Sequence, residues 1–146
     1  MFCRINKYIV EKKSITLLFI ISGLVPFYLE SFLVYFVHLN DSTLLSTVSE
    51  MSYLYGALIV SFLSGMQWQR AIKSKTDKLT LIIPMVPFFF IWFYDANFFL
   101  KKEFVIIACL SFSLFIDLKF FKNYLTKDFL KLRFIVTTLA IFSYLI

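Results

Sequence analysis

The stretch Tyr55–Trp68, with the sequence YGALIVSFLSGMQW, decides the fold that we expect for this chain. It is an apolar run of helix length in which Ala57, Ser61 and Gly65 recur every four residues, so they share one face of a helix. Such a small-residue face lets another helix backbone approach closely, which matters in a bilayer because apolar burial drives little helix association there. The run therefore predicts a membrane helix with Ala57, Ser61 and Gly65 as helix-packing residues.

The composition extends this expectation to the whole chain. Hydrophobic residues make up 60% of the 146 residues and the mean hydropathy is +0.83, whereas soluble domains contain about 45–50% apolar residues. The net charge of +6 would suggest nucleic acid as the partner of a soluble protein. Here the basic residues fall in short clusters between apolar runs, a pattern that reports membrane topology. We expect the lipid bilayer as partner, and no nucleic acid.

Five apolar segments have about the length needed to cross ~30 Å of hydrocarbon at ~1.5 Å per residue. Within a single membrane domain, we expect spans at about residues 15–38, 50–68, 79–99, 104–121 and 129–146. Residues 39–49 are rich in Ser and Thr and lack Lys and Arg, which predicts a loop. Pro84 and Pro87 interrupt the third span, and because each removes a backbone donor, we expect this span to be the most irregular.

Lys and Arg are distributed asymmetrically over the segments between these spans. Four precede the first span, none follows it, four follow the second, two follow the third and five lie from Lys119 to Arg133. Alternate segments thus carry thirteen on one side and two on the other, which by the positive-inside rule gives N-in/C-out orientation. The expected fold is an all-α integral membrane protein, a bundle of five transmembrane helices. Its membrane is a bacterial inner (cell) membrane or, in a eukaryote, the mitochondrial inner membrane.

Short motifs spread over most of the chain resemble the transmembrane-protein-69-like family, small multi-spanning membrane proteins with a domain of unknown function. The matching pieces are GLVPF at 23–27, SFLSG at 61–65 with Trp68, Asp117, and Leu132-Arg133 with Val136-Thr137. The chain departs from the family pattern at Ser64, where a second glycine is expected, and at Gln69, where a glycine is expected after the tryptophan. The resemblance implies a five-helix membrane protein and supplies no activity.

The first span carries a polar and kinked stripe. Gly23, Pro26 and Glu30 lie three and four residues apart, so they share a face, and Pro26 predicts a kink. Gly23 and Pro26 make this span the expected neighbour of the small-residue face. Glu30 is expected about 6 Å from the middle of the span. An ionisable group in hydrocarbon is a functional candidate because its burial is costly; the alternative is a protonated Glu30 that only forms a hydrogen bond to a neighbouring helix.

Asp117 lies near the cytoplasmic end of the fourth span, where a carboxylate can stay hydrated. We favour an interfacial salt bridge with Lys119 or Arg133 and predict that Arg133 is the partner. More broadly, the cytoplasmic side gathers five candidate functional or interfacial residues, namely Gln67, Trp68, Arg70, Asp117 and Arg133. They suggest either an ordinary interfacial belt, which we favour, or a head-group-binding site in which guanidiniums hold a phosphate.

Catalytic signatures are missing from the sequence. It has no HExxH, GxSxG, GxGxxG or Walker motif, and with one His and two Cys it offers no metal site, catalytic residue or cofactor site. We favour a non-enzymatic interaction or assembly factor that packs through its small-residue face against a membrane-protein partner or a second copy. The alternative is a small transporter or a lipid- or ion-binding membrane protein that uses Glu30 and Asp117.

Overall fold

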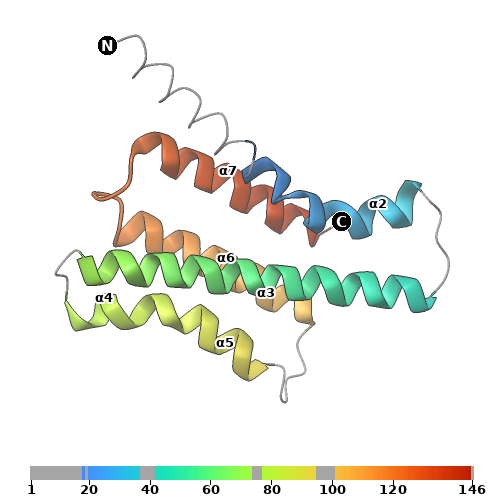
Figure 1. Cartoon of the computed structure of the whole chain (residues 1–146), viewed down its shortest axis with the longest axis horizontal. Helices are drawn as coiled ribbons and strands as arrows, with labels where there is room; N and C mark the ends of the chain where they lie inside the picture. The colour runs from blue at the N-terminus through green and yellow to red at the C-terminus, as the bar shows by residue number, and fades with distance from the viewer. Residues whose placement is uncertain (1–17, 19, 37–41, 74–76, 95–100, 146) are drawn as a thin grey trace, which may run out of the picture.

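The computed structural model describes residues 18, 20–36, 42–73, 77–94 and 101–145, which form a bundle of helices without strands (Figure 1). The elements are α2 (Val25–Phe36), α3 (Ser42–Lys73), α4 (Lys78–Ile82), the 3-10 helix η1 (Ile83–Met85), α5 (Val86–Tyr94), α6 (Lys102–Lys119) and α7 (Lys127–Ser143). The all-α prediction is confirmed.

Each expected span overlaps helix in the structure, although the bounds differ at several ends. Among the described residues, no helix combines the length and the apolar character needed to count as a membrane span. The membrane part of the expected fold therefore stays a prediction.

α3 is the central element of the bundle. It has 32 residues and is about 48 Å long. It contacts α2, α5 and α6, while α7 packs against α6 and α2. In Figure 1, α3 crosses the middle of the molecule, with α4 and α5 on one side of it and α7 and α2 on the other. Side chains from α2, α5 and α6 therefore meet on α3.

The N-terminal part of α3 corrects the predicted loop at 39–49. Residues from Ser42 onward are helical, and the hydroxyls of Ser46 and Thr47 both donate to the carbonyl oxygen of Thr43 at 2.9 Å. Hydroxyls that bond to the preceding turn are satisfied within a helix, so this polar composition did not require a loop. Residues 39–41 lie outside the described part of the chain.

The proline-containing segment is irregular, as predicted. Pro84 lies in η1 and Pro87 at the start of α5, so the chain passes from α-helix through a 3-10 turn and back. Both prolines are buried, and the Cys109 thiol of α6 lies 3.8 Å from the carbonyl oxygen of Pro87 as a hydrogen-bond donor. The packing of α6 and α3 over this bend supports the irregular backbone.

The first span also bends. The helical residues before position 23 end in a turn at Gly23 and Leu24, and α2 begins at Val25 with Pro26 in its first turn, a position that proline favours. The Tyr55 hydroxyl of α3 donates to the Gly23 carbonyl oxygen at 2.8 Å. The first span therefore neighbours α3, as expected, but an aromatic hydroxyl makes this contact.

The face that α3 turns inward differs from the predicted one. Its buried residues include Ser52, Gly56, Val60, Ser64 and Gln67. A Cβ atom added at Gly56 would lie 2.5 Å from the Tyr144 hydroxyl and 2.9 Å from Ile106 Cγ2, so helices approach closely there.

Ala57, Ser61 and Gly65, which the sequence predicts as the helix-packing residues, are therefore not the inward face of α3 among the described residues. Gly65 is exposed, and no atom lies within 4 Å of a Cβ placed on it. Ala57 and Ser61 are half-buried, and the Ser61 hydroxyl donates to the Ala57 carbonyl oxygen within α3 at 2.8 Å. The inward face lies one residue around the helix, at Gly56.

Candidate functional site

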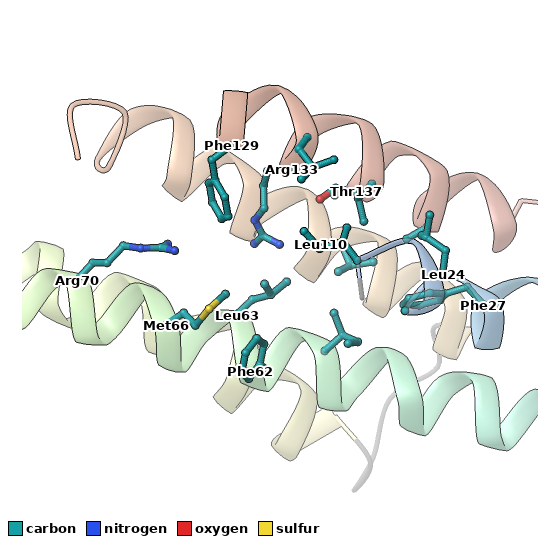
Figure 2. A pocket seen from close by; sticks show the side chains of 16 residues that line it. Leu24, Phe27, Phe62, Leu63, Met66, Arg70, Leu110, Phe129, Arg133 and Thr137 are labelled. Carbon is teal, nitrogen blue, oxygen red and sulfur yellow. The ribbon is translucent and has the colours of Figure 1, made fainter. Parts of the chain in front are cut away.

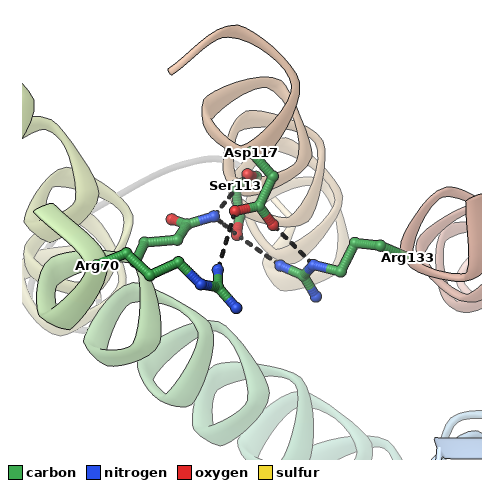
Figure 3. Close-up of polar contacts among 5 residues, drawn as sticks. Arg70, Ser113, Asp117 and Arg133 are labelled. Carbon is green, nitrogen blue, oxygen red and sulfur yellow. Dashed lines mark hydrogen bonds and ion pairs between the residues drawn. The ribbon is translucent and has the colours of Figure 1, made fainter. Parts of the chain in front are cut away.

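Polar side chains from three helices meet inside one end of the bundle. α3 contributes Gln67 and Arg70 near its C-terminus, α6 contributes Ser113 and Asp117, and α7 contributes Arg133. We call these five residues the polar cluster. Figure 3 shows Arg70 and Arg133 approaching Asp117 from different helices on opposite sides.

Asp117 is the centre of the polar cluster. Its Oδ2 accepts from Arg133 Nε at 2.8 Å, and its Oδ1 lies 3.4 Å from Arg70 Nη1. The Asp117 side chain has no exposed surface, whereas those of Arg133 and Arg70 are 13% and 24% exposed. The predicted Asp117–Arg133 pair is confirmed, but the expectation of a hydrated carboxylate is wrong, because three helices enclose it.

Gln67 and Ser113 extend the polar cluster between α3 and α6. Gln67 Nε2 donates to the Ser113 carbonyl oxygen at 2.8 Å and to Ser113 Oγ at 3.1 Å, and Arg133 Nη2 donates to the same hydroxyl at 3.1 Å. Gln67 Oε1 and Ser64 Oγ are also buried and lack a hydrogen-bond partner within the described residues. α3 therefore directs its amide and hydroxyl groups into the bundle.

A cavity of about 380 Å³ adjoins the polar cluster (Figure 2). Its lining comes from α3 and α7, with Leu110 of α6 and, at the far end, Leu24 and Phe27. Most of this lining is apolar, but Arg70 and Arg133 reach it at one end, as Figure 2 shows. The cavity thus has a cationic end and an apolar body.

Both guanidiniums that line this end have N–H donors without a partner among the described residues. A guanidinium has five N–H donors; Arg133 uses two of them, on Asp117 and Ser113, and Arg70 uses one. The rest have no acceptor in the described part of the chain. Arg70 Cζ also lies 5.6 Å from the centroid of the Phe129 ring, a cation–π contact. With two cations and one anion, this end of the cavity can bind an anion.

The other predicted site residues lie apart from the polar cluster. Trp68 is 41% exposed on α3. Lys119, the alternative partner of Asp117, instead lies over the rings of Phe115 and Phe120 at 5.3 and 5.7 Å. Glu30 is part of α2, but its side chain lies outside the described part of the structure.

Ser113 and Phe129 are the members of this site that sequence reasoning missed. Ser113 lies four residues before Asp117, a spacing that places both on one face of α6. That signal could have revealed Ser113. Phe129 carries no comparable signal, because it is one of twenty phenylalanines. Over the described residues, no three His, Cys, Asp or Glu side chains gather as metal ligands.

A family model described as "Protein of unknown function (DUF3429)" matches residues 12–146. The chain belongs to this family. The match covers the described helices α2 to α7 and every residue of the polar cluster, and it does not itself connect the chain to the transmembrane-protein-69-like family. No solved structure matches the chain.

Proposed function

We propose that this member of the DUF3429 family is a non-enzymatic integral membrane protein that acts by binding. In this proposal the five helical segments cross a bacterial inner membrane or a mitochondrial inner membrane with N-in/C-out orientation. The resemblance to the transmembrane-protein-69-like family is part of the same proposal. The proposal of a membrane protein rests on the positions of polar and apolar side chains in the bundle, rather than on the length or apolar character of any one helix.

The observation that carries the proposal is that the bundle buries polar side chains and exposes large apolar ones. Gln67, Ser113 and Asp117 have no exposed surface. Large apolar side chains cover the outside, including Trp92 and Phe93 of α5, which are 66% and 62% exposed. In water, Gln and Asp are mostly exposed and contiguous apolar patches are rare on monomers. Lipid would solvate this apolar surface and leave the polar groups to satisfy one another.

The positions of the charges support the proposed orientation. Arg70 and Lys73 lie at the C-terminal end of α3, and Lys119 lies at the C-terminal end of α6. Arg133 belongs to the N-terminal half of α7. These cations share the end of the bundle that the charge count assigns to the cytoplasm, as the positive-inside rule requires.

The chemistry of the polar cluster favours binding over catalysis. Guanidiniums occupy both Asp117 oxygens, and the remaining side chains are an amide and a hydroxyl. Such a group can hold an anion and tie helices together. The same ion pairs give less support to the alternative of a transporter that uses Asp117 and Glu30, because a guanidinium already neutralises the carboxylate that would carry a cation.

A protein partner or a second copy remains part of the proposed function. Gly65 is exposed on α3 between the exposed side chains of Phe62 and Trp68. A small residue between large ones leaves a recess that another helix can fill in a bilayer. The outward position of Gly65 therefore supports the proposed interaction or assembly role of the small-residue face.

Membrane insertion is tested with paired reporters, alkaline phosphatase for the outside and green fluorescent protein for the inside. They are fused after Ser14, Asn40, Lys75, Lys101, Asn123 and Ile146. We expect the two reporters to give opposite and alternating signals, beginning with inside at Ser14. We also expect the full chain to stay in the membrane pellet after alkaline carbonate extraction. Release of the chain by carbonate, or one side reported at every position, would contradict the proposal.

A further inference from the structure

We propose that the cavity between α3 and α7 binds one anionic phospholipid of the cytoplasmic leaflet, with the phosphate at Arg70 and Arg133 and an acyl chain along the apolar body. This inference rests on the proposed membrane location. It adds to that location a specific ligand class and the residues that would recognise it.

Charge at the cationic end argues for an anionic head group. Arg70 and Arg133 carry two positive charges, and Asp117 supplies one negative charge, so the end nearest the cavity keeps a net positive charge. Guanidiniums bind phosphate oxygens through short, charge-assisted hydrogen bonds, often in pairs. A phosphate can accept the unused donors of both arginines without displacing Asp117.

Asp117 holds the two guanidiniums in place before any ligand arrives. It binds Arg133 Nε at 2.8 Å and Arg70 Nη1 at 3.4 Å, and Ser113 Oγ holds Arg133 Nη2 at 3.1 Å. Arg70 also packs over the ring of Phe129. Ordering these long side chains in advance lowers the entropy that a ligand would otherwise lose on binding. The contacts within the polar cluster therefore prepare the site.

The body of the cavity suits a hydrocarbon chain. Phe62, Met66 and Val136 line it, and Leu24 and Phe27 close the end away from the arginines. Its volume of about 380 Å³ lies within the range of ~300–1,000 Å³ typical of small-molecule sites. An amphiphile with one charged end and one apolar end matches this division.

The depth of the site matches the lipid head groups. Arg70 lies one turn before the end of α3, and Arg133 lies six residues into α7, or about 9 Å from its start. Long cationic side chains at such depth reach toward the interface. Anionic phospholipids give the cytoplasmic leaflet its negative surface potential, so the abundant amphiphile at this position has the required charge.

The test uses the full-length protein in nanodiscs made from equal parts of dioleoylphosphatidylglycerol and dioleoylphosphatidylcholine, with retained lipids counted by native mass spectrometry. We expect the parent to retain one phosphatidylglycerol with a preference on the order of tenfold. Arg70→Gln leaves the shorter Arg133–Asp117 contact in place, and we expect it to reduce this preference to about equal retention. Val136→Trp fills the apolar body and is expected to remove retention of either lipid.

Each variant has a matched control outside the cavity. Lys73→Gln removes an exposed cation one turn beyond Arg70. Ile135→Trp adds the same indole at the position next to Val136, where Ile135 is 55% exposed. Both are expected to bind lipid like the parent. Thermal stability of all variants is measured in the same nanodiscs, so that a loss of fold is distinguished from a loss of the site.

Several outcomes would overturn the inference. Arg70→Gln with an unchanged preference would exclude the head-group site, and Val136→Trp that binds like Ile135→Trp would exclude the chain site. Displacement of phosphatidylglycerol by added oleate at equal concentration would make a free fatty acid the occupant. If native mass spectrometry shows a lipid-free dimer, the occupant of the cavity is a second copy of the chain. If it shows a lipid-free monomer, no lipid binds. In all these cases carbonate extraction can still support membrane insertion, so the two proposals fail separately.

Discussion

α3 meets its neighbours in two different ways along its length. Around Gly56 it packs against Ile106 of α6 and Tyr144, which follows α7, so closely that an added methyl group has no room. Around Gln67, three turns later, hydrogen bonds and ion pairs join it to Ser113 and Asp117 of α6. The first contact depends on side-chain volume and the second on paired polar atoms.

The difference predicts opposite sensitivities at the two contacts. A close contact tolerates the loss of a polar atom better than the gain of a carbon, because overpacking forces neighbouring side chains and backbone to shift. A buried polar contact tolerates a change of volume better than the loss of a partner, because an unpaired buried charge is costly. The expected effects therefore decrease from the buried ion pairs to the exposed glycine.

The largest effect is expected for Asp117→Asn. This change removes the buried negative charge that pairs with Arg133 and Arg70, and leaves both partly buried guanidiniums without this counter-charge. Breaking a buried ion pair costs about 3–5 kcal/mol, so we expect a loss of about that size in the free energy of unfolding, measured by denaturant titration in detergent. Asp77→Asn, at an exposed position, is the matched control.

A double-mutant cycle sharpens this prediction. Arg133→Gln alone is expected to destabilise the bundle, because among the described residues it leaves the buried carboxylate with the 3.4 Å contact to Arg70 as its one ion pair. The double variant Asp117→Asn/Arg133→Gln is expected to lose less than the sum of the two single losses, since of this ion-paired group only Arg70 then keeps a charge without its partner. Additive losses would show that the two groups do not interact.

Gly56→Ala tests the close contact. The new Cβ would lie 2.5 Å from the Tyr144 hydroxyl, which is held by a 2.9 Å hydrogen bond to the Ser52 carbonyl oxygen, and 2.9 Å from Ile106 Cγ2. We expect a loss of about 1–3 kcal/mol in the free energy of unfolding. Adding Tyr144→Phe removes the hydroxyl and is expected to recover part of this loss; no coupling between the two changes would contradict the contact.

A smaller effect is expected for Tyr55→Phe. The change keeps the ring and its edge-to-face contact with Phe27, at 5.1 Å between centroids, but removes the 2.8 Å hydrogen bond to the Gly23 carbonyl oxygen. A single hydrogen bond contributes about 0.5–1.5 kcal/mol, so thermal stability is expected to fall modestly. Tyr124→Phe, at an exposed position, is the control for loss of a hydroxyl. Equal stability of the two variants would argue against a structural role for this bond.

The smallest effect, with the opposite sign, is expected for Gly65→Ala. The position is helical and open, so the methyl group meets no atom, and replacing a mid-helix glycine with alanine stabilises a helix by about 0.5–1 kcal/mol. We expect the monomer to unfold at slightly higher temperature than the parent, in contrast to Gly56→Ala. Gly65→Leu is likewise expected to leave the monomer folded, and weaker self-association measured by cross-linking would place a second copy at Gly65.

The two glycines also show what the sequence could and could not predict. Apolar run lengths and the two prolines located the apolar part of each helical segment and the irregular one, but not the polar N-terminal turns of α3. The order of those segments was sufficient to pair Asp117 with Arg133. Which face of α3 turns inward was not predictable from the sequence. Small residues repeat about every four positions on two faces, one with Ala57, Ser61 and Gly65 and one with Gly56. The contacts with α6 and Tyr144 determine which of the two faces is buried.

The inward direction of Gln67 was missed for a related reason. A glutamine next to Trp68 at the end of an apolar run is typical of a membrane interface, and its partner Ser113 is 46 residues away in the sequence. Long-range partners of this kind leave no local pattern. The burial of Asp117 depended on the same unseen contacts between helices.

The last helix of the bundle has a consequence for how the chain matures. Synthesis proceeds from the N-terminus, so Tyr144 reaches Ser52 across 92 positions, and Arg133 reaches Asp117, only after nearly all of the protein has left the ribosome. Until then, among the described residues, Arg70 is the charged partner of Asp117, and Gly56 is covered by Ile106 but not by Tyr144. The C-terminal segment from Arg133 to Tyr144 thus completes both contacts. Before this segment packs, Asp117 lacks the cover of α7, and the incomplete chain is a substrate for the proteases and chaperones that act on newly made proteins.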